Sequence, residues 1–159
     1  MALSLEIKNN STQLSRKFKN IESDLPRLIS KGLLQAGFQL LEIIKTKTKK
    51  GIDFRDKFFA PYSQGYLKKL KAEGKPTNVD LFYSGRMLGT LTPSNAIKKI
   101  GNYQVSLGFN NSEMRKRALF NQVLGRTKRE FFGFNDRTKQ IIQRSFNLFM
   151  QKEFRKFNT

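Results

Sequence analysis

The chain contains neither cysteine nor histidine among its 159 residues. The absence of cysteine excludes a disulfide framework and thiolate metal sites. The absence of histidine excludes the Ser-His-Asp and Cys-His nucleophile arrangements, the usual zinc sites and the most common general base. Only carboxylate chemistry would remain, and the 12 acidic residues form no Asp-x-Asp or Glu-x-x-Glu cluster. Few ordinary routes to catalysis therefore remain, and we expect no cofactor and no metal ion.

Tryptophan and long apolar runs are also missing. The N-terminus has no signal-peptide core, and no stretch reaches the roughly 18 uninterrupted apolar residues of a membrane span. We therefore expect a soluble chain that is made in the cytoplasm and has no membrane partner. Its length suits a single domain over residues 1–159, in which the 15 phenylalanines do most of the large-volume packing. Residues 1–22 are polar and irregular, which predicts a flexible or partner-bound N-terminal segment, although the spacing of Leu14, Phe18 and Ile21 would also suit the start of a helix.

What the chain has in excess is positive charge, with 31 Lys and Arg residues against 12 Asp and Glu and a formal net charge of +19. The excess is spread over the whole chain and is not confined to a tail. A whole domain this basic favours a polyanion or an acidic protein as a neighbour. Compositional drift towards Lys, Asn, Ile and Phe in an AT-rich genome is the simpler alternative. The pattern indicates no reading of a specific nucleotide sequence.

The spacing of apolar residues predicts a helix-rich domain with one hairpin. A long helix over residues 24–49 has Asp24 as its cap, Pro26 in its first turn and Gly51 just beyond its end. A long central loop follows over residues 51–79, in which Tyr66 to Lys71 could form a turn of helix. The remaining expected elements are a short helix over 85–91 capped by Ser84, a hairpin of 96–100 and 103–109, a helix from 111 or 112 to about 124 closed by Gly125, and a last helix from 135 or 136 to about 154. The predicted fold class is α+β, a small antiparallel sheet with the long N-terminal helix and the C-terminal helix packed on it.

Large aromatic side chains lie in segments without helical or strand periodicity. Loops that contain large apolar residues usually meet a partner, so these residues are candidates for a subunit interface or for anchoring the loops to their own domain. Stacking on single-stranded bases is the alternative, because cations lie beside them. Asp53 and Asp56 are expected to pair with Lys or Arg, or to accept backbone N–H groups, and not to bind a metal. The interface candidates are Phe54, Phe58, Phe59, Tyr62, Phe131, Phe132 and Phe134.

The last predicted helix is amphipathic. At 100° per residue, its apolar residues between Ile142 and Phe154 share one face. Three arginines fall in one line on the opposite face, with a lysine beside them. This face is either an ordinary solvated surface or a basic stripe aimed at a phosphate backbone. The DNA-facing candidates are Arg137, Arg144, Lys152 and Arg155.

Six segments with aromatic residues, glycines and charges follow one another along the chain: 51–63 (GIDFRDKFFAPYS), 66–69 (YLKK), 79–88 (VDLFYSGRML), 105–109 (VSLGF), 121–125 (NQVLG) and 128–134 (KREFFGF). In this order and spacing they resemble the phage virion-morphogenesis or tail-completion family over roughly residues 25–145. The family pattern has a glycine- and aromatic-rich loop, a Lys-rich step, a segment with Ser or Thr before Gly, a strand ending in Gly, a His-Gln-x-Gly segment and a Phe-rich turn. The chain departs from the pattern at Asn121, where the family often has His, and before Arg129, where it lacks Pro.

The resemblance implies a structural, non-enzymatic role in the neck of a virion. Such proteins complete the tail or join head to tail as closed rings around the DNA passage. A homo-oligomeric ring, hexameric or alternatively twelve-fold, would contact neighbouring head-tail connector and tail proteins, with genomic DNA in or near its lumen. The protein would be found in the virion, and in the host cytoplasm during assembly. The rival readings are a stand-alone basic nucleic-acid-binding module and a nuclease that depends on Asp53 and Asp80.

Overall fold

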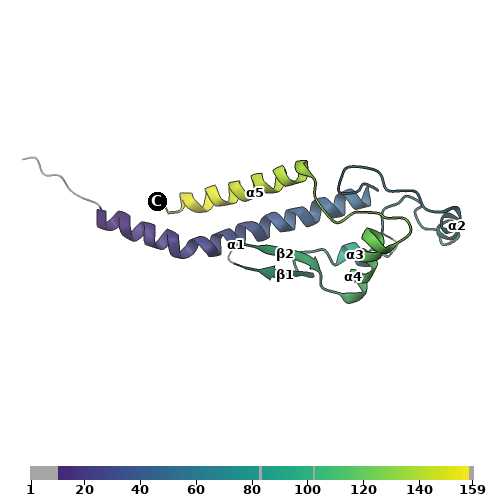
Figure 1. Cartoon of the computed structure of the whole chain (residues 1–159), viewed down its shortest axis with the longest axis horizontal. Coiled ribbons are helices and arrows are strands. Elements are labelled where there is room, and N and C mark those ends of the chain that lie inside the picture. The colour runs from purple at the N-terminus through teal and green to yellow at the C-terminus, as the bar shows by residue number, and fades with distance from the viewer. Residues whose placement is uncertain (1–10, 83, 102, 158–159) are drawn as a thin grey trace, which may run out of the picture.

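The longest element of the chain is α1 (Ser11–Lys49). The computed structural model describes residues 11–82, 84–101 and 103–157, so the expectation for residues 1–10 lies outside the described residues. The predicted start at Asp24 is wrong, because Asp24 pairs with Arg27 at 2.9 Å inside the helix instead of capping it. Pro26 also lies inside, where it removes one backbone N–H donor, and Figure 1 shows the axis changing direction in this N-terminal part.

The C-terminal helix α5 (Asp136–Arg155) runs along α1 (Figure 1). The helix begins at Asp136, one of the two predicted starts, and Asn135 caps it by accepting the Thr138 N–H at 2.9 Å. The two helices approach closely at Gly32 of α1, where a Cβ atom would lie 2.8 Å from the Phe149 ring and 2.9 Å from the Phe146 ring. The apolar face predicted for α5 therefore covers α1.

One antiparallel hairpin completes the regular backbone. Strands β1 (Ala96–Ile100) and β2 (Val105–Phe109) pair with Ala96 opposite Phe109, and β2 packs on α1 with Leu107 against Gly37. The described chain is thus a helix-dominated mixed fold, with the long N-terminal and C-terminal helices that the sequence predicts. The predicted layering of both long helices on a sheet is wrong, because the packing partner of α5 is α1. Asn102 of the expected turn lies outside the described residues.

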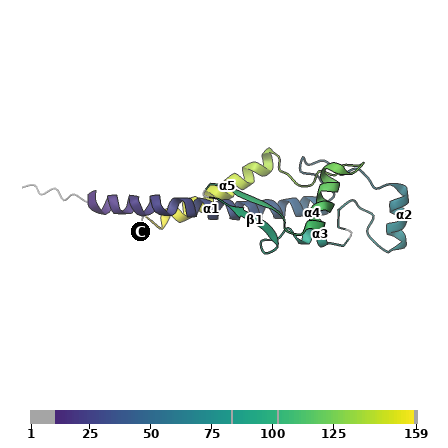
Figure 2. The same cartoon turned by 60° about the horizontal axis from the view of Figure 1, so that its bottom comes forward.

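Short helices fill the end of the molecule away from the start of α1, as Figure 2 shows for α2 (Gln64–Ala72), α3 (Arg86–Gly89) and α4 (Ser112–Leu119). The predicted cap Ser84 is wrong for α3, since Gly85 caps it with a φ of 68°. The helix after Asn111 ends at Gly125 as expected, but its last five residues form a π-helical segment, η1 (Phe120–Leu124), in which the Gly125 N–H bonds to the Phe120 carbonyl at 2.7 Å.

The core lies where α1, the hairpin, α3 and α4 meet. It contains residues from distant parts of the chain, including Leu41, Leu88, Phe109 and Phe131. Burial of each such side chain contributes about 1.5–3 kcal/mol of stabilisation. None of the helices in the described ranges combines the length and the apolar character that crossing a bilayer requires. Because Phe131 and other loop residues belong to this core, the core fixes the loops at the α2 end, where the candidate site is found.

Candidate functional site

The central loop and the Phe-rich turn, which are far apart in the sequence, lie against each other. The Phe54 N–H donates to the Glu130 carbonyl at 3.2 Å, and Arg55 pairs with the Glu130 carboxylate at 2.6 Å. Gly133 permits the contact, since a Cβ atom there would lie 2.9 Å from the Phe54 ring. Two of the segments that carry the family resemblance thus build one end of the molecule together.

The two loop carboxylates are occupied by the protein itself, as the sequence predicts. Asp53 accepts the backbone N–H groups of Arg55 and Lys57, each at 2.8 Å. Asp56 forms an ion pair with Lys47 at 2.6 Å and accepts a hydrogen bond from the Asn135 amide. The Lys47 hydrogen bond, followed by that of Asn135, holds the pKa of Asp56 below its ordinary value. These carboxylates tighten the loop and tie it to α1 and α5.

The seven interface candidates separate into three groups by burial. Phe59 and Phe131 lie in the core of this chain, so their assignment to a subunit interface is corrected: they anchor their loops to the domain. Phe58 and Phe134 are 83% and 54% exposed and remain available to a neighbour. The half-buried members are Phe54, Tyr62 and Phe132.

In the described part of the chain, one run of exposed apolar side chains was not among the predicted interface residues. Leu119, Phe120, Val123 and Leu124, which we call the η1 patch, are 48%, 61%, 50% and 66% exposed. Their spacing at positions i, i+1, i+4 and i+5 places them within an arc of about 140° on an α-helix. This spacing predicts an apolar face, but it does not predict that the face is exposed, because a buried helix has the same spacing.

Gln122 fixes the η1 patch to the Phe-rich turn. Its side-chain amide donates to the Phe132 carbonyl and accepts from the Phe132 N–H, both at 3.0 Å. Phe132 in turn packs at 5.7 Å from the Phe109 ring and 6.2 Å from the Phe131 ring. The patch is therefore held rigidly to the core although its own side chains face outwards.

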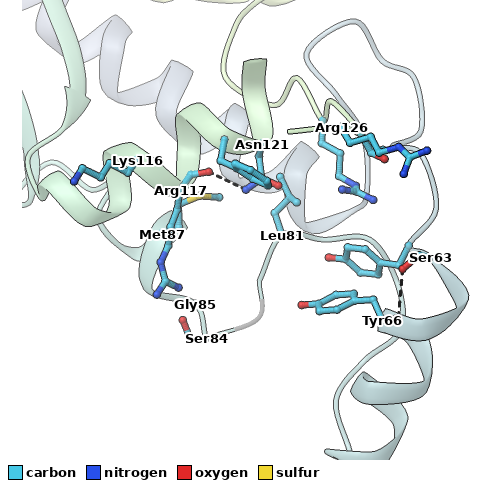
Figure 3. Close-up of a pocket in the computed structure, with 14 residues that line it drawn as sticks. Ser63, Tyr66, Leu81, Ser84, Gly85, Met87, Lys116, Arg117, Asn121 and Arg126 are labelled. Carbon is cyan, nitrogen blue, oxygen red and sulfur yellow. Dashed lines mark hydrogen bonds between the residues drawn. The ribbon is translucent and has the colours of Figure 1, made fainter. Parts of the chain in front are cut away.

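A cleft of about 760 Å³ opens beside the patch (Figure 3). Its apolar surface includes Leu81, Met87 and two tyrosines, and Tyr62 and Tyr66 meet edge to face at 4.9 Å. Burial, followed by the Asp80 carboxylate, raises the pKa of Tyr62, so its hydroxyl stays protonated at neutral pH. Among the described residues that line the cleft there are four cations and no acid: Lys116, Arg117, Arg126 and Arg129.

The four DNA-facing candidates are all exposed on α5. The face of α5 that covers α1 is the apolar one, and Arg137, Arg144 and Arg155 lie on the opposite face. Lys152 instead borders α1, because it lines a hollow together with Gln35 of α1. The structure thus places the three predicted arginines on one outward face, with Lys152 at its edge, and on a different element from the cleft cations.

No family model matches the chain, and neither the curated proteins nor the solved structures contain a match to it. The resemblance to the tail-completion family therefore stays a prediction. The same holds for the expectations that the chain has no enzymatic activity, no cofactor and no bound metal.

Proposed function

We propose that this protein is a structural component of a phage virion neck that completes the tail or joins head to tail. In this proposal it forms a homo-oligomeric ring around the DNA passage and contacts connector and tail proteins above and below. The observation that carries the proposal is the η1 patch. It is an apolar surface on a rigid, very basic domain, at the point where the resembling segments come together.

The exposure of the patch favours assembly. Four large apolar side chains lie within six residues, and Phe58 and Phe134 add exposed rings on the adjoining loops. Contiguous apolar patches of this kind mark interaction surfaces in soluble proteins. A ring requires that the η1 patch of one copy contact a different surface of the next copy, and the exposed rings of Phe58 and Phe134 are candidates for that surface. A heterologous contact between two different surfaces is the kind that closes rings.

The basic face of α5 supports a role for DNA in the same proposal. Arg137, Arg144, Lys152 and Arg155 are exposed along a helix of 20 residues, with Asp56 near Arg137 and Glu153 near Lys152. Such cations would neutralise phosphates without reading bases. The same cations favour the second candidate function, a stand-alone nucleic-acid-binding module, which would act as a monomer or dimer.

Oligomeric state and DNA affinity distinguish the two functions. We expect negative-stain images and native mass spectrometry of the purified protein to show closed rings. The double variant Val123→Ser with Leu124→Ser should shift it to monomers, because about 100 Å² or more of apolar area per protomer leaves the contact. Tyr103→Ser, which alters an exposed ring on the hairpin, is the matched control and should still assemble.

The opposite result would favour the binding module. A protein that stays monomeric at all concentrations, and that binds duplex DNA with a steep salt dependence, contradicts the ring. Labelling of intact virions with an antibody against the chain then gives an independent reading, since a neck component must be found where head and tail meet.

A further inference from the structure

We propose that the cleft between α2 and α4–η1 binds an acidic segment of a protein partner, with one apolar or aromatic side chain inserted beside Tyr66 and Met87. The inference rests on the proposed structural role, and it names the chemistry of one neighbour in the assembly. It concerns residues outside the η1 contact tested above, apart from Phe120, which borders both.

The floor of the cleft is apolar and preformed. Met87 is 7% exposed and belongs to the core, so the floor cannot collapse when the cleft is empty. Leu81 and Gly85 hold positive φ angles of 54° and 68° beside it. Non-glycine residues in this region carry strain that surrounding structure must support, and such strain gathers at binding sites. The volume of about 760 Å³ is large enough for a side chain together with its flanking backbone.

The rim is cationic and partly immobilised. Arg129 donates from Nε to the Ala60 carbonyl at 3.2 Å and from Nη2 to the Pro61 carbonyl at 3.1 Å, and its guanidinium lies 4.9 Å from the Tyr62 ring centroid. Arg117 is held by Glu113 at 2.6 Å. Arg126 has no ion-pair partner within the described part of the chain. Cations that are already ordered lose little entropy on binding, so they favour carboxylates in fixed positions.

The arrangement favours a peptide over a single-stranded nucleic acid. Single-stranded sites stack successive bases on open aromatic faces. Here the Tyr62 and Tyr66 rings meet at 70°, and a face of Tyr62 is covered by Arg129. Figure 3 shows Tyr66 pointing from α2 across the cleft, towards the side where Leu81 and Met87 lie. An apolar centre with a charged rim is the anatomy of a protein interface.

The test measures the binding of a short labelled peptide of glutamates around a central phenylalanine by fluorescence anisotropy. Arg117→Gln with Arg126→Gln should weaken binding by about tenfold, because two rim cations are lost. Lys68→Gln with Lys71→Gln, two exposed cations on the other face of α2, is the control for net charge and should change affinity less than about twofold. If the double variant unfolds, Arg126→Gln alone should still show weaker binding of the peptide.

A second pair of measurements tests whether an aromatic side chain of the peptide is inserted beside Tyr66. Replacing the central phenylalanine of the peptide by alanine should lower its affinity for the unmodified protein by about tenfold, and Tyr66→Ala should abolish this difference. No peptide binding, equal losses in the cleft and control variants, or tighter binding of an oligothymidylate that the cleft variant abolishes would each overturn the proposal. If the protein forms rings but does not bind the peptide, only the proposal of a peptide-binding cleft is refuted. If a monomeric protein binds the peptide, only the proposal of a ring is refuted.

Discussion

The amide of Gln122 is the contact whose removal tests the architecture of the site most directly. It satisfies both the N–H and the carbonyl of Phe132, and it joins η1 to the Phe-rich turn over ten residues of sequence. Gln122→Met removes both hydrogen bonds while keeping the length and volume of the side chain. No cavity is created, so the measured loss reports on the two backbone groups left without a partner.

The magnitude follows from the state of those two groups. A buried polar group that loses its only partner costs about 1–3 kcal/mol. Gln122 and Phe132 are half-buried, so water reaches the site in part and the lower end applies to each group. We expect Gln122→Met to lower the free energy of unfolding by about 2 kcal/mol. Gln122→Glu keeps the acceptor for the Phe132 N–H but turns an anion towards the Phe132 carbonyl. It should therefore lower the free energy of unfolding by about 1 kcal/mol or more.

Urea unfolding followed by circular dichroism measures the change as a shift of the midpoint at constant slope. The matched control is Gln143→Met on the exposed side of α5, for which we expect a change within about 0.5 kcal/mol. Hydrogen exchange of the Phe132 amide should accelerate only in the Gln122 variants. A Gln122→Met protein as stable as its control, with the amide still protected, would refute the claim that this side chain holds the patch.

Three further outcomes follow from single contacts. Gly32→Ala should destabilise by about 1–3 kcal/mol because its Cβ meets two phenylalanine rings of α5, whereas Gly65→Ala, with nothing within 4 Å, should stabilise by about 0.5–1 kcal/mol; thermal denaturation compares them. Asp56→Asn should remove the Lys47 ion pair. Since the pKa of Asp56 is lowered in the folded protein, the advantage of the unmodified protein should be present above the ordinary value of 3.8 and vanish as the pH falls through the lowered pKa, as urea unfolding at several pH values would show. Arg144→Gln should reduce the slope of log K against log salt for duplex DNA by about 1, and an unchanged slope would place DNA elsewhere.

Some local features could be predicted from the sequence, although the caps predicted at Asp24 and Ser84 were wrong. Asn111 and Asn135, each one of the two residues expected at its helix start, cap α4 and α5 through side-chain oxygens, because a cap needs only the residue and the next turn. Gly51 ends α1 with a φ of 75° for a similarly local reason. The carboxylates of Asp53 and Asp56 also behaved as expected, since cations and free N–H groups lay within a few residues or at the next helix end.

The start of α1 and the roles of the loop aromatics could not be predicted, because contacts with other residues decide them. Asp24 and Pro26 carry a start signal, but the helix continues through them because the preceding residues also adopt helical geometry and Arg27 takes the carboxylate of Asp24. Phe58 and Phe59 are neighbours, yet one is exposed and the other buried. In a loop no periodicity assigns a face, so only tertiary contacts decide which ring becomes an anchor.

The η1 patch and the basic face of α5 should respond to salt in opposite ways. The η1 patch lies near the α2 end, whereas α5 runs back along α1 towards the opposite end (Figure 1), so a protein neighbour and a phosphate backbone can be bound at the same time. Contacts through an apolar patch are strengthened by sulfate, while phosphate contacts weaken as counterion release becomes less favourable. Sedimentation and DNA binding measured across one ammonium sulfate series should therefore move in opposite directions. If assembly weakens in parallel with DNA affinity, the subunits are joined through charge, and the η1 patch is not the contact that closes the ring.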